Sequence, residues 1–270
     1  MQAITIDGLS FHVETTGDPG APAIVFANAL GTDLRVWDAV TPLLPAGLHV
    51  IRYDKRGHGL SDDAPGRWRI EDFADDLAGI LDRLDVSGAA VVGLSVGGLI
   101  AQSLAARRPD LVRVLILSGT AAKIGDDALW NERIGVVSGQ GVAAVADAIL
   151  ERWFSPDFRE RDPSFAVWRN MLLRSPLGGY VATCGAIRDA DLTESTRALA
   201  LPTLAMVGAL DGSTPPDLVR GTAALIAGAR FEILPGVGHI PGVERPDLVA
   251  GVIGDFLKES GHVIDAKVPA

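Results

Sequence analysis

The feature that most restricts the fold of this chain is a serine placed between two glycines directly after an apolar run. Residues 89–92 read Ala-Ala-Val-Val, residues 93–97 read Gly-Leu-Ser-Val-Gly, and an alanine-rich segment with helical spacing follows at once. This order predicts a strand, a sharp turn at Ser95 and a helix, in which the two glycines supply room that side chains would fill. Such a turn raises the serine hydroxyl above the end of the strand as a candidate nucleophile.

A nucleophile on such a turn works with an acid and a histidine that follow it in the chain. Residues 202–208 read as a buried strand that opens into a loop with Asp211, and residues 231–234 read as the next strand, followed by a loop with His239. Both loops follow the carboxyl ends of strands, where open parallel sheets carry their sites. We therefore predict a catalytic unit in which His239 accepts the proton of Ser95 and Asp211 orients His239.

Two backbone N–H groups are the candidate donors to the negative oxygen that forms when a carbonyl is attacked. The N–H of Val96 follows the candidate nucleophile directly. The second donor is expected in the turn over residues 28–32, which follows an apolar strand, and the N–H of Leu30 is the candidate. The turn has Asn28-Ala29 where many proteins with this arrangement have His-Gly.

His239 is one of five histidines, and chain position separates it from the other four. His58 follows a strand but precedes the serine, so we expect it to pack in the wall of the site. The remaining three, His12, His49 and His262, are expected at the surface.

Strand and helix patterns alternate up to about residue 119 and again from about residue 201. This alternation predicts an α/β protein with a mainly parallel twisted sheet flanked by helices. Between the two parts the pattern is helical, which predicts a cap inserted over the carboxyl ends of the strands. The expected organisation is a core of residues 1–120 and 201–258, a cap of residues 121–200 and a loosely held tail of residues 259–270.

The predicted cap is rich in tryptophan and arginine. A cap of this kind excludes water, and its guanidinium groups can grip an acidic group of a substrate. The alternative for each residue is a role without substrate contact, because most of the arginines are expected in solvent and most of the tryptophans in the core of the cap. The residues in question are Trp130, Trp153, Trp168, Arg133, Arg152, Arg159, Arg161, Arg169 and Arg174.

The composition of the chain argues against several classes of function. The 270 residues and 48% hydrophobic content suit one enzyme domain, and the net charge of −10 argues against a nucleic-acid surface. Neither metal-ligand spacing nor a phosphate loop is present, so we expect no metal and no cofactor. The single cysteine, Cys184, and the absence of a signal-like start or a membrane-length apolar run predict a cytoplasmic protein without membrane contact. The oligomeric state stays open.

Six segments carry a resemblance that spans nearly the whole chain. They are residues 28–37 (NALGTDLRVW), 52–59 (RYDKRGHG), 93–98 (GLSVGG), 119–125 (GTAAKIG), 152–154 (RWF) and 186–191 (AIRDAD). Together they resemble the 3-oxoadipate enol-lactonases of the α/β-hydrolase superfamily, and the last three segments are the more particular to that family. The resemblance implies the α/β-hydrolase fold and hydrolysis of 3-oxoadipate enol-lactone to 3-oxoadipate in the β-ketoadipate pathway of aromatic catabolism.

The implied substrate is a small anionic lactone, which an acidic protein can capture only with a local cation. Arg133 is the first candidate to hold its carboxylate bidentately, and Trp153 is the candidate for an apolar wall against the ring. Three alternatives stay open: an esterase, a hydrolase that cuts carbon–carbon bonds, and a ligand-binding receptor with the same architecture.

Overall fold

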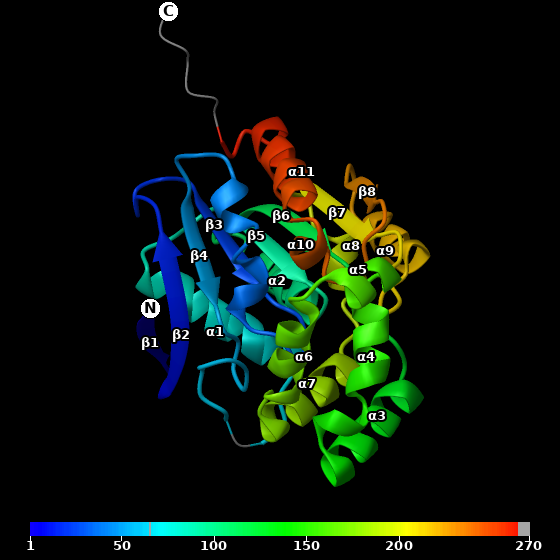
Figure 1. The fold of residues 1–270 in the computed structure, drawn as a ribbon. Helices are drawn as coiled ribbons and strands as arrows, with labels where there is room; N and C mark the ends of the chain where they lie inside the picture. The colour runs from blue at the N-terminus through cyan, green and yellow to red at the C-terminus, as the bar shows by residue number, and fades with distance from the viewer. Residues whose placement is uncertain (65, 264–270) are drawn as a thin grey trace, which may run out of the picture.

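Within residues 1–64 and 66–263, which this computed structural model describes, the strands form one eight-stranded sheet (Figure 1). The strands are β1 (Gln2–Ile6), β2 (Leu9–Thr16), β3 (Ala23–Ala27), β4 (His49–Tyr53), β5 (Ala89–Leu94), β6 (Val112–Ser118), β7 (Thr203–Gly208) and β8 (Arg230–Leu234). Their order in the sheet is β1-β2-β4-β3-β5-β6-β7-β8. The pairs β1–β2 and β2–β4 are antiparallel, and every pair from β4 to β8 is parallel. The predicted, mainly parallel sheet is thus confirmed.

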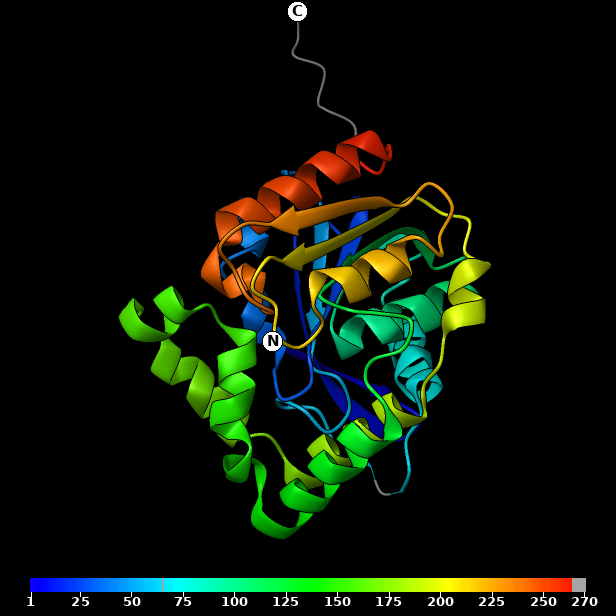
Figure 2. The ribbon, with the colours of Figure 1, turned by 90° about the vertical axis from the view of Figure 1, so that its right-hand side faces the viewer.

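The central strands are apolar throughout because helices cover both faces of the sheet. Every residue of β3, β5 and β7 is buried. The helices α1 (Ile70–Arg83), α2 (Val96–Arg107) and α9 (Pro216–Ala223) lie on one face, and α11 (Pro246–Glu259) lies on the other (Figures 1 and 2). The short helices η1 (Leu34–Trp37), η2 (Thr41–Leu43) and α10 (Pro241–Glu244) belong to the same core.

A run of helices lies between β6 and β7, inside the range 121–200 expected to form a cap. It comprises α3 (Asp127–Gln140), η3 (Val142–Ala144), α4 (Ala146–Trp153), α5 (Pro156–Arg161), α6 (Phe165–Leu173), α7 (Leu177–Asp189) and α8 (Thr193–Arg197). Figure 2 shows the arrows of β7 and β8 ending on the side of the molecule where the green helices of this run gather, whereas the yellow α8 lies on the other side. None of the helices in the described part of the chain combines the length and apolar character needed to cross a bilayer.

Three histidines expected at the surface are buried instead, so that expectation is wrong. His12 on β2 pairs its Nδ1 with Asp54 Oδ2 over 2.7 Å, and His49 at the start of β4 is 3% exposed. His262 donates its Nε2–H to the carbonyl oxygen of Ala23 over 2.9 Å. Burial lowers the pKa of His49 and of His262, so both are neutral at pH 7.

The start of the predicted tail is also packed. Helix α11 extends to Glu259, and the buried His262 contacts the first residue of β3. Residues 264–270 lie outside the described residues.

The turn after β5 leaves no space for a side chain at its first glycine. A Cβ on Gly93 would lie 2.3 Å from the carbonyl oxygen of Gly97. We expect Gly93→Ala to lower the free energy of unfolding by about 1–3 kcal/mol or more, measured by urea denaturation, because backbone atoms would have to move.

The matched control is Gly251→Ala on the exposed side of helix α11, where an added Cβ meets nothing within 4 Å. This change should stabilise the protein by up to about 1 kcal/mol, because alanine favours a helix over glycine. Equal stability of the two variants would contradict the tight-turn interpretation.

Candidate active site

Ser95 lies between the end of β5 and the first residue of α2, with φ 58° and ψ −120°. This left-handed backbone is unfavourable for a residue with a side chain, and it persists because the surroundings are closely packed. A Cβ on Gly97 would lie 2.2 Å from the carbonyl oxygen of Ala27, and the Thr120 hydroxyl donates to the Ser95 carbonyl over 2.6 Å. The turn therefore presents Ser95 above the carboxyl end of β5.

Asp211 and His239 meet in the loops that follow β7 and β8. The Nδ1 of His239 lies 2.8 Å from Asp211 Oδ2, and the Thr214 hydroxyl donates to the same oxygen over 2.8 Å. The other oxygen, Oδ1, accepts the backbone N–H groups of Ser213 and Thr214, each over 2.8 Å. Both oxygens of the carboxylate are thus held by donors.

These contacts set the ionisation of Asp211. Burial raises the pKa of Asp211, but the charge and hydrogen bond of His239 and the N–H groups of Thr214 and Ser213 lower it, and the net pKa lies below its ordinary value. The ionised carboxylate accepts the Nδ1 proton of His239. The Nε2 of the same ring is then left with a free lone pair, which is what a base for a serine needs.

Ser95 and His239 line one cavity of about 80 Å³ beneath the cap. Neither the Ser95 hydroxyl nor His239 Nε2 has a hydrogen-bond partner among the described residues. Four larger cavities, of about 370, 380, 460 and 700 Å³, contain neither residue. In the described part of the chain, no group of three or more His, Cys, Asp or Glu side chains is placed to hold a metal ion.

Two backbone N–H groups at the predicted positions have no hydrogen-bond partner among the described residues. The N–H of Val96 belongs to the first residue of α2, where a helix leaves its N–H groups unbonded and its dipole favours negative charge. The N–H of Leu30 makes no hydrogen bond to any described residue, and Leu30 lines the same cavity as Ser95. Their role as oxyanion donors stays a prediction. It is supported by the lack of a hydrogen-bond partner for either N–H among the described residues.

The structure brings the predicted Arg133 and Trp153 to this cavity and adds Arg152 and Tyr180. Arg133 stacks over the Trp130 ring at 5.4 Å from its centroid. Burial raises the pKa of the Tyr180 hydroxyl, and the neighbouring Arg133 and Arg152 partly offset this rise. Neither arginine pairs with a carboxylate among the described residues. The cavity therefore holds two guanidinium groups that lack an internal counter-ion.

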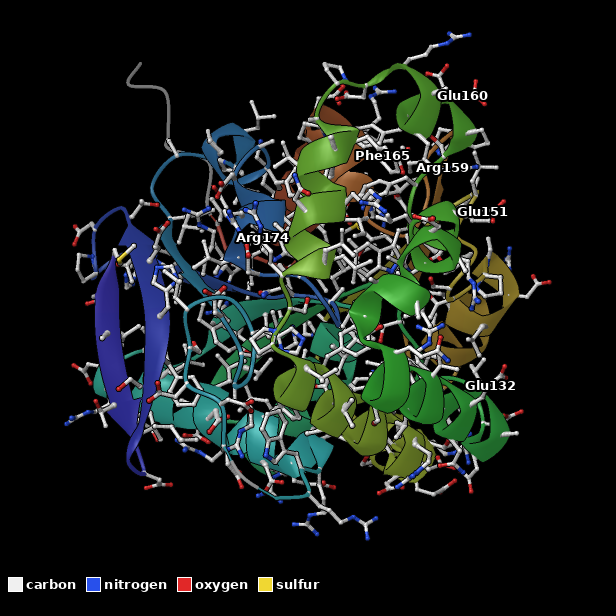
Figure 3. The ribbon with its side chains drawn as sticks, turned by 60° about the horizontal axis from the view of Figure 1, so that its bottom comes forward. Glu132, Glu151, Arg159, Glu160, Phe165 and Arg174 are labelled. Carbon is white, nitrogen blue, oxygen red and sulfur yellow. The ribbon has the colours of Figure 1, made fainter. Side chains whose placement is uncertain are left out.

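The other cap arginines considered for this role lie elsewhere. Arg169 pairs with Asp147 over 3.5 Å, and Arg174 lines the separate cavity of about 370 Å³. In Figure 3, which labels Arg174, the exposed Glu132, Glu151 and Glu160 follow the outer side of the cap. The labelled glutamates thus lie on the outer side of the cap, whereas Arg133 and Arg152, which have no carboxylate partner among the described residues, line the cavity beneath it.

The end of α4 is bonded directly to both loops of the site. The carbonyl of Arg152 accepts the N–H of Gly212 over 3.2 Å, and the carbonyl of Trp153 accepts the N–H of His239 over 2.8 Å. The last carbonyls of a helix have no partner within it, so these loops satisfy groups that α4 leaves open. The cap thereby fixes the backbone beside Asp211 and His239.

Glu244 makes a second link between cap and core. Its carboxylate accepts the N–H of Gly238 over 2.7 Å and the N–H and hydroxyl of Ser155. Sequence reasoning missed this contact, because Glu244 and Ser155 are 89 residues apart and no local pattern joins them. Thr214 was missed as well, although an aspartate in a turn commonly accepts hydrogen bonds from the backbone N–H groups that follow it.

Comparison with known proteins agrees with this geometry. Residues 22–138 match the family model for the alpha/beta hydrolase fold. The chain is 32% identical to 3-oxoadipate enol-lactonase 2 of Acinetobacter baylyi over 90% of its own length and 91% of that protein. The crystal structure of the enol-lactonase from Burkholderia xenovorans LB400 superimposes with a TM-score of 0.92 at 36% identity, covering 95% of this chain and all of that one.

A thermophilic esterase from Thermogutta terrifontis is also similar. It has a TM-score of 0.89 at 28% identity and covers 97% of this chain and 100% of its own. Sequence similarity over nine-tenths of the chain, the sheet order and the strained serine turn lead to the same assignment: this chain belongs to the alpha/beta hydrolase family.

Proposed function

We propose that the protein hydrolyses 3-oxoadipate enol-lactone to 3-oxoadipate. The observation that carries this proposal is that Arg133 and Arg152, without carboxylate partners among the described residues, line the cavity that also contains Ser95 and His239. In a protein of net charge −10, unpaired guanidinium groups at this place favour a small substrate with a carboxylate. The similarity to enol-lactonases supports the same substrate and the β-ketoadipate pathway. The cytoplasmic location stays a prediction.

The proposed reaction starts with proton transfer from the Ser95 hydroxyl to Nε2 of His239, while Oγ attacks the lactone carbonyl. The carbonyl oxygen becomes negative, and the N–H groups of Val96 and Leu30 are its donors. When the tetrahedral intermediate collapses, the ring C–O bond breaks. The leaving oxygen is that of an enol, which takes the proton from His239, and the enol then becomes a ketone.

Water completes the cycle. His239 Nε2 removes a proton from a water molecule that attacks the acyl group on Ser95, and a second tetrahedral intermediate forms on the same two donors. Its collapse breaks the bond to Oγ, and His239 returns the proton to the serine. The product is a ketone with two carboxylates, and Asp211 stabilises the imidazolium in both halves of the reaction.

The arginines would hold the free carboxylate of the lactone away from the reacting carbonyl. A guanidinium forms two parallel hydrogen bonds with a carboxylate, and partial burial strengthens them. Trp153, which is 6% exposed, offers an apolar wall for the ring. The small volume of the cavity restricts this role to a compact substrate.

An esterase is the second candidate, because the Thermogutta terrifontis esterase is similar over 97% of this chain. Turnover of the enol-lactone compared with p-nitrophenyl acetate separates the two candidates. A lactonase is expected to prefer the enol-lactone in kcat/KM by orders of magnitude, whereas an esterase would not.

The three proposed catalytic residues are expected to act as one unit. Ser95→Ala or His239→Ala should lower kcat by several orders of magnitude and leave about 10³-fold catalysis over water from the oxyanion donors and binding alone. Decay of the enol-lactone absorbance measures this directly. Near-normal turnover by Ser95→Ala would reject the nucleophile, and full activity of Asp211→Asn would reject the acid.

The two cavity arginines are expected to bind the carboxylate. Arg133→Ala should raise KM for the enol-lactone by an amount that corresponds to about 2–5 kcal/mol, because one partner of a partly buried ion pair is lost. Arg133→Lys should recover part of this loss, since lysine restores the charge without the planar fork. Arg152→Ala tests the second guanidinium in the same assay.

Two controls accompany this series. A neutral ester without a carboxylate should keep its kcat/KM in the Arg133 and Arg152 variants. Arg174→Ala, in the separate cavity, should keep enol-lactone KM within about twofold of the wild type. If both cavity variants keep that KM as well, the carboxylate is bound elsewhere.

A further inference from the structure

Lys55 is an unusual residue for the interior of a core. Lys55 follows β4 and is 1% exposed. Its Nζ donates to the carbonyl oxygens of Ala29 over 2.6 Å and Thr32 over 3.3 Å. No carboxylate lies within ion-pair distance of Nζ among the described residues. Burial lowers the pKa of Lys55 to about 7, although the more distant charges of Asp54 and Asp33 oppose this. A buried ammonium without an ion pair is costly, so its position calls for a reason.

The acceptor of the shorter hydrogen bond, the carbonyl of Ala29, suggests why Lys55 lies here. The carbonyl of Ala29 and the N–H of Leu30 are the two ends of a single peptide group, which resonance makes one planar unit. Its oxygen accepts Lys55 Nζ over 2.6 Å and the Thr32 hydroxyl over 2.9 Å, whereas its N–H has no partner among the described residues. A lysine donor at the oxygen, strongest when it is protonated, draws electron density from the nitrogen and makes the N–H a stronger donor.

The next peptide of the turn is held at its N–H group rather than at its carbonyl oxygen. The N–H of Gly31 donates to Nε2 of His58 over 3.1 Å, and Nδ1–H of His58 donates to the carbonyl of Arg56 over 3.2 Å. This arrangement needs a neutral ring, and burial lowers the pKa of His58 well below its ordinary value, as does the charge of Lys55. His58, expected to pack in the wall of the site, therefore engages the Gly31 N–H and leaves that of Leu30 free.

We propose that Lys55 is a positioning residue for catalysis, which holds and polarises the Ala29–Leu30 peptide so that the Leu30 N–H binds the reaction's oxyanion more strongly. Lys55 touches neither substrate nor nucleophile and acts only through this peptide. The inference rests on the proposed function, because it assumes that Ser95 attacks a carbonyl beside Leu30.

The test compares the wild type with Lys55→Met, which keeps the length of the side chain and removes its charge. The probes are p-nitrophenyl acetate and an alkyl trifluoromethyl ketone, which forms a tetrahedral adduct with a nucleophilic serine and places a negative oxygen on the oxyanion donors. We expect kcat to fall about ten- to a hundredfold with KM within about twofold, because loss of a whole donor lowers kcat about 10²–10³-fold. The inhibition constant of the ketone should rise by a factor similar to the loss in kcat/KM.

Thermal unfolding separates this role from a structural one. Replacing a buried charge by an apolar side chain of similar volume is often neutral or stabilising, so Lys55→Met should keep or raise Tm while it lowers kcat. The matched variant is Thr32→Val, which removes an uncharged donor from the same carbonyl oxygen. Its kcat should fall less than that of Lys55→Met, since a charged donor polarises the peptide more.

The outcomes are distinct. Unchanged kcat and ketone affinity in Lys55→Met would overturn the inference and leave the proposed function intact. A loss of kcat with a lowered Tm and unchanged ketone affinity would also overturn it, because the residue would then be structural. If the wild type turns over neither the enol-lactone nor the ester and does not bind the ketone, the proposed function fails and the inference fails with it.

Discussion

The left-handed backbone of Ser95 is the constraint on which the arrangement of the site depends. A φ of 58° at a residue with a side chain is sustained only by close packing, and here Gly97 lies against the end of β3 while Thr120 bonds the serine carbonyl. Since β3, β5, β7 and β8 are parallel, their carboxyl ends share one edge of the sheet. The loops with Leu30, Asp211 and His239 therefore lead to the place where the turn presents its serine.

The cap does more than cover this edge. Helix α4 uses its terminal carbonyls to bind the backbone beside Asp211 and His239, so the same residues that present Arg152 and Trp153 to the cavity also order the catalytic loops. Glu244 joins Ser155 of the cap to Gly238 of the core. A displacement of α4 would move Arg152 and the backbone of His239 together, so under the proposed function binding and chemistry would be coupled through the backbone.

The chain as a whole is acidic, whereas the cavity that contains Ser95 is lined by two arginines. The net charge of −10 repels anions at long range, but salt screens such repulsion over about 8–10 Å. At the cavity, Arg133, Arg152 and Tyr180 lie close together. Lys55 extends this pattern behind the turn of residues 28–32, where a positive charge reaches the site through a peptide group rather than through space alone.

The amino-acid sequence by itself determined the features that depend on short segments: the serine turn, the strands before Asp211 and His239, and the alternation that makes a parallel sheet. Each depends on residues that are close together in the chain, because backbone conformation and apolar periodicity are local properties. Only the tertiary structure decided which cap arginines face the cavity, why three histidines expected at the surface are buried, and how Lys55, His58 and Glu244 support the site. These contacts join segments far apart in the chain, so they depend on how the helices and loops pack and not on any local pattern.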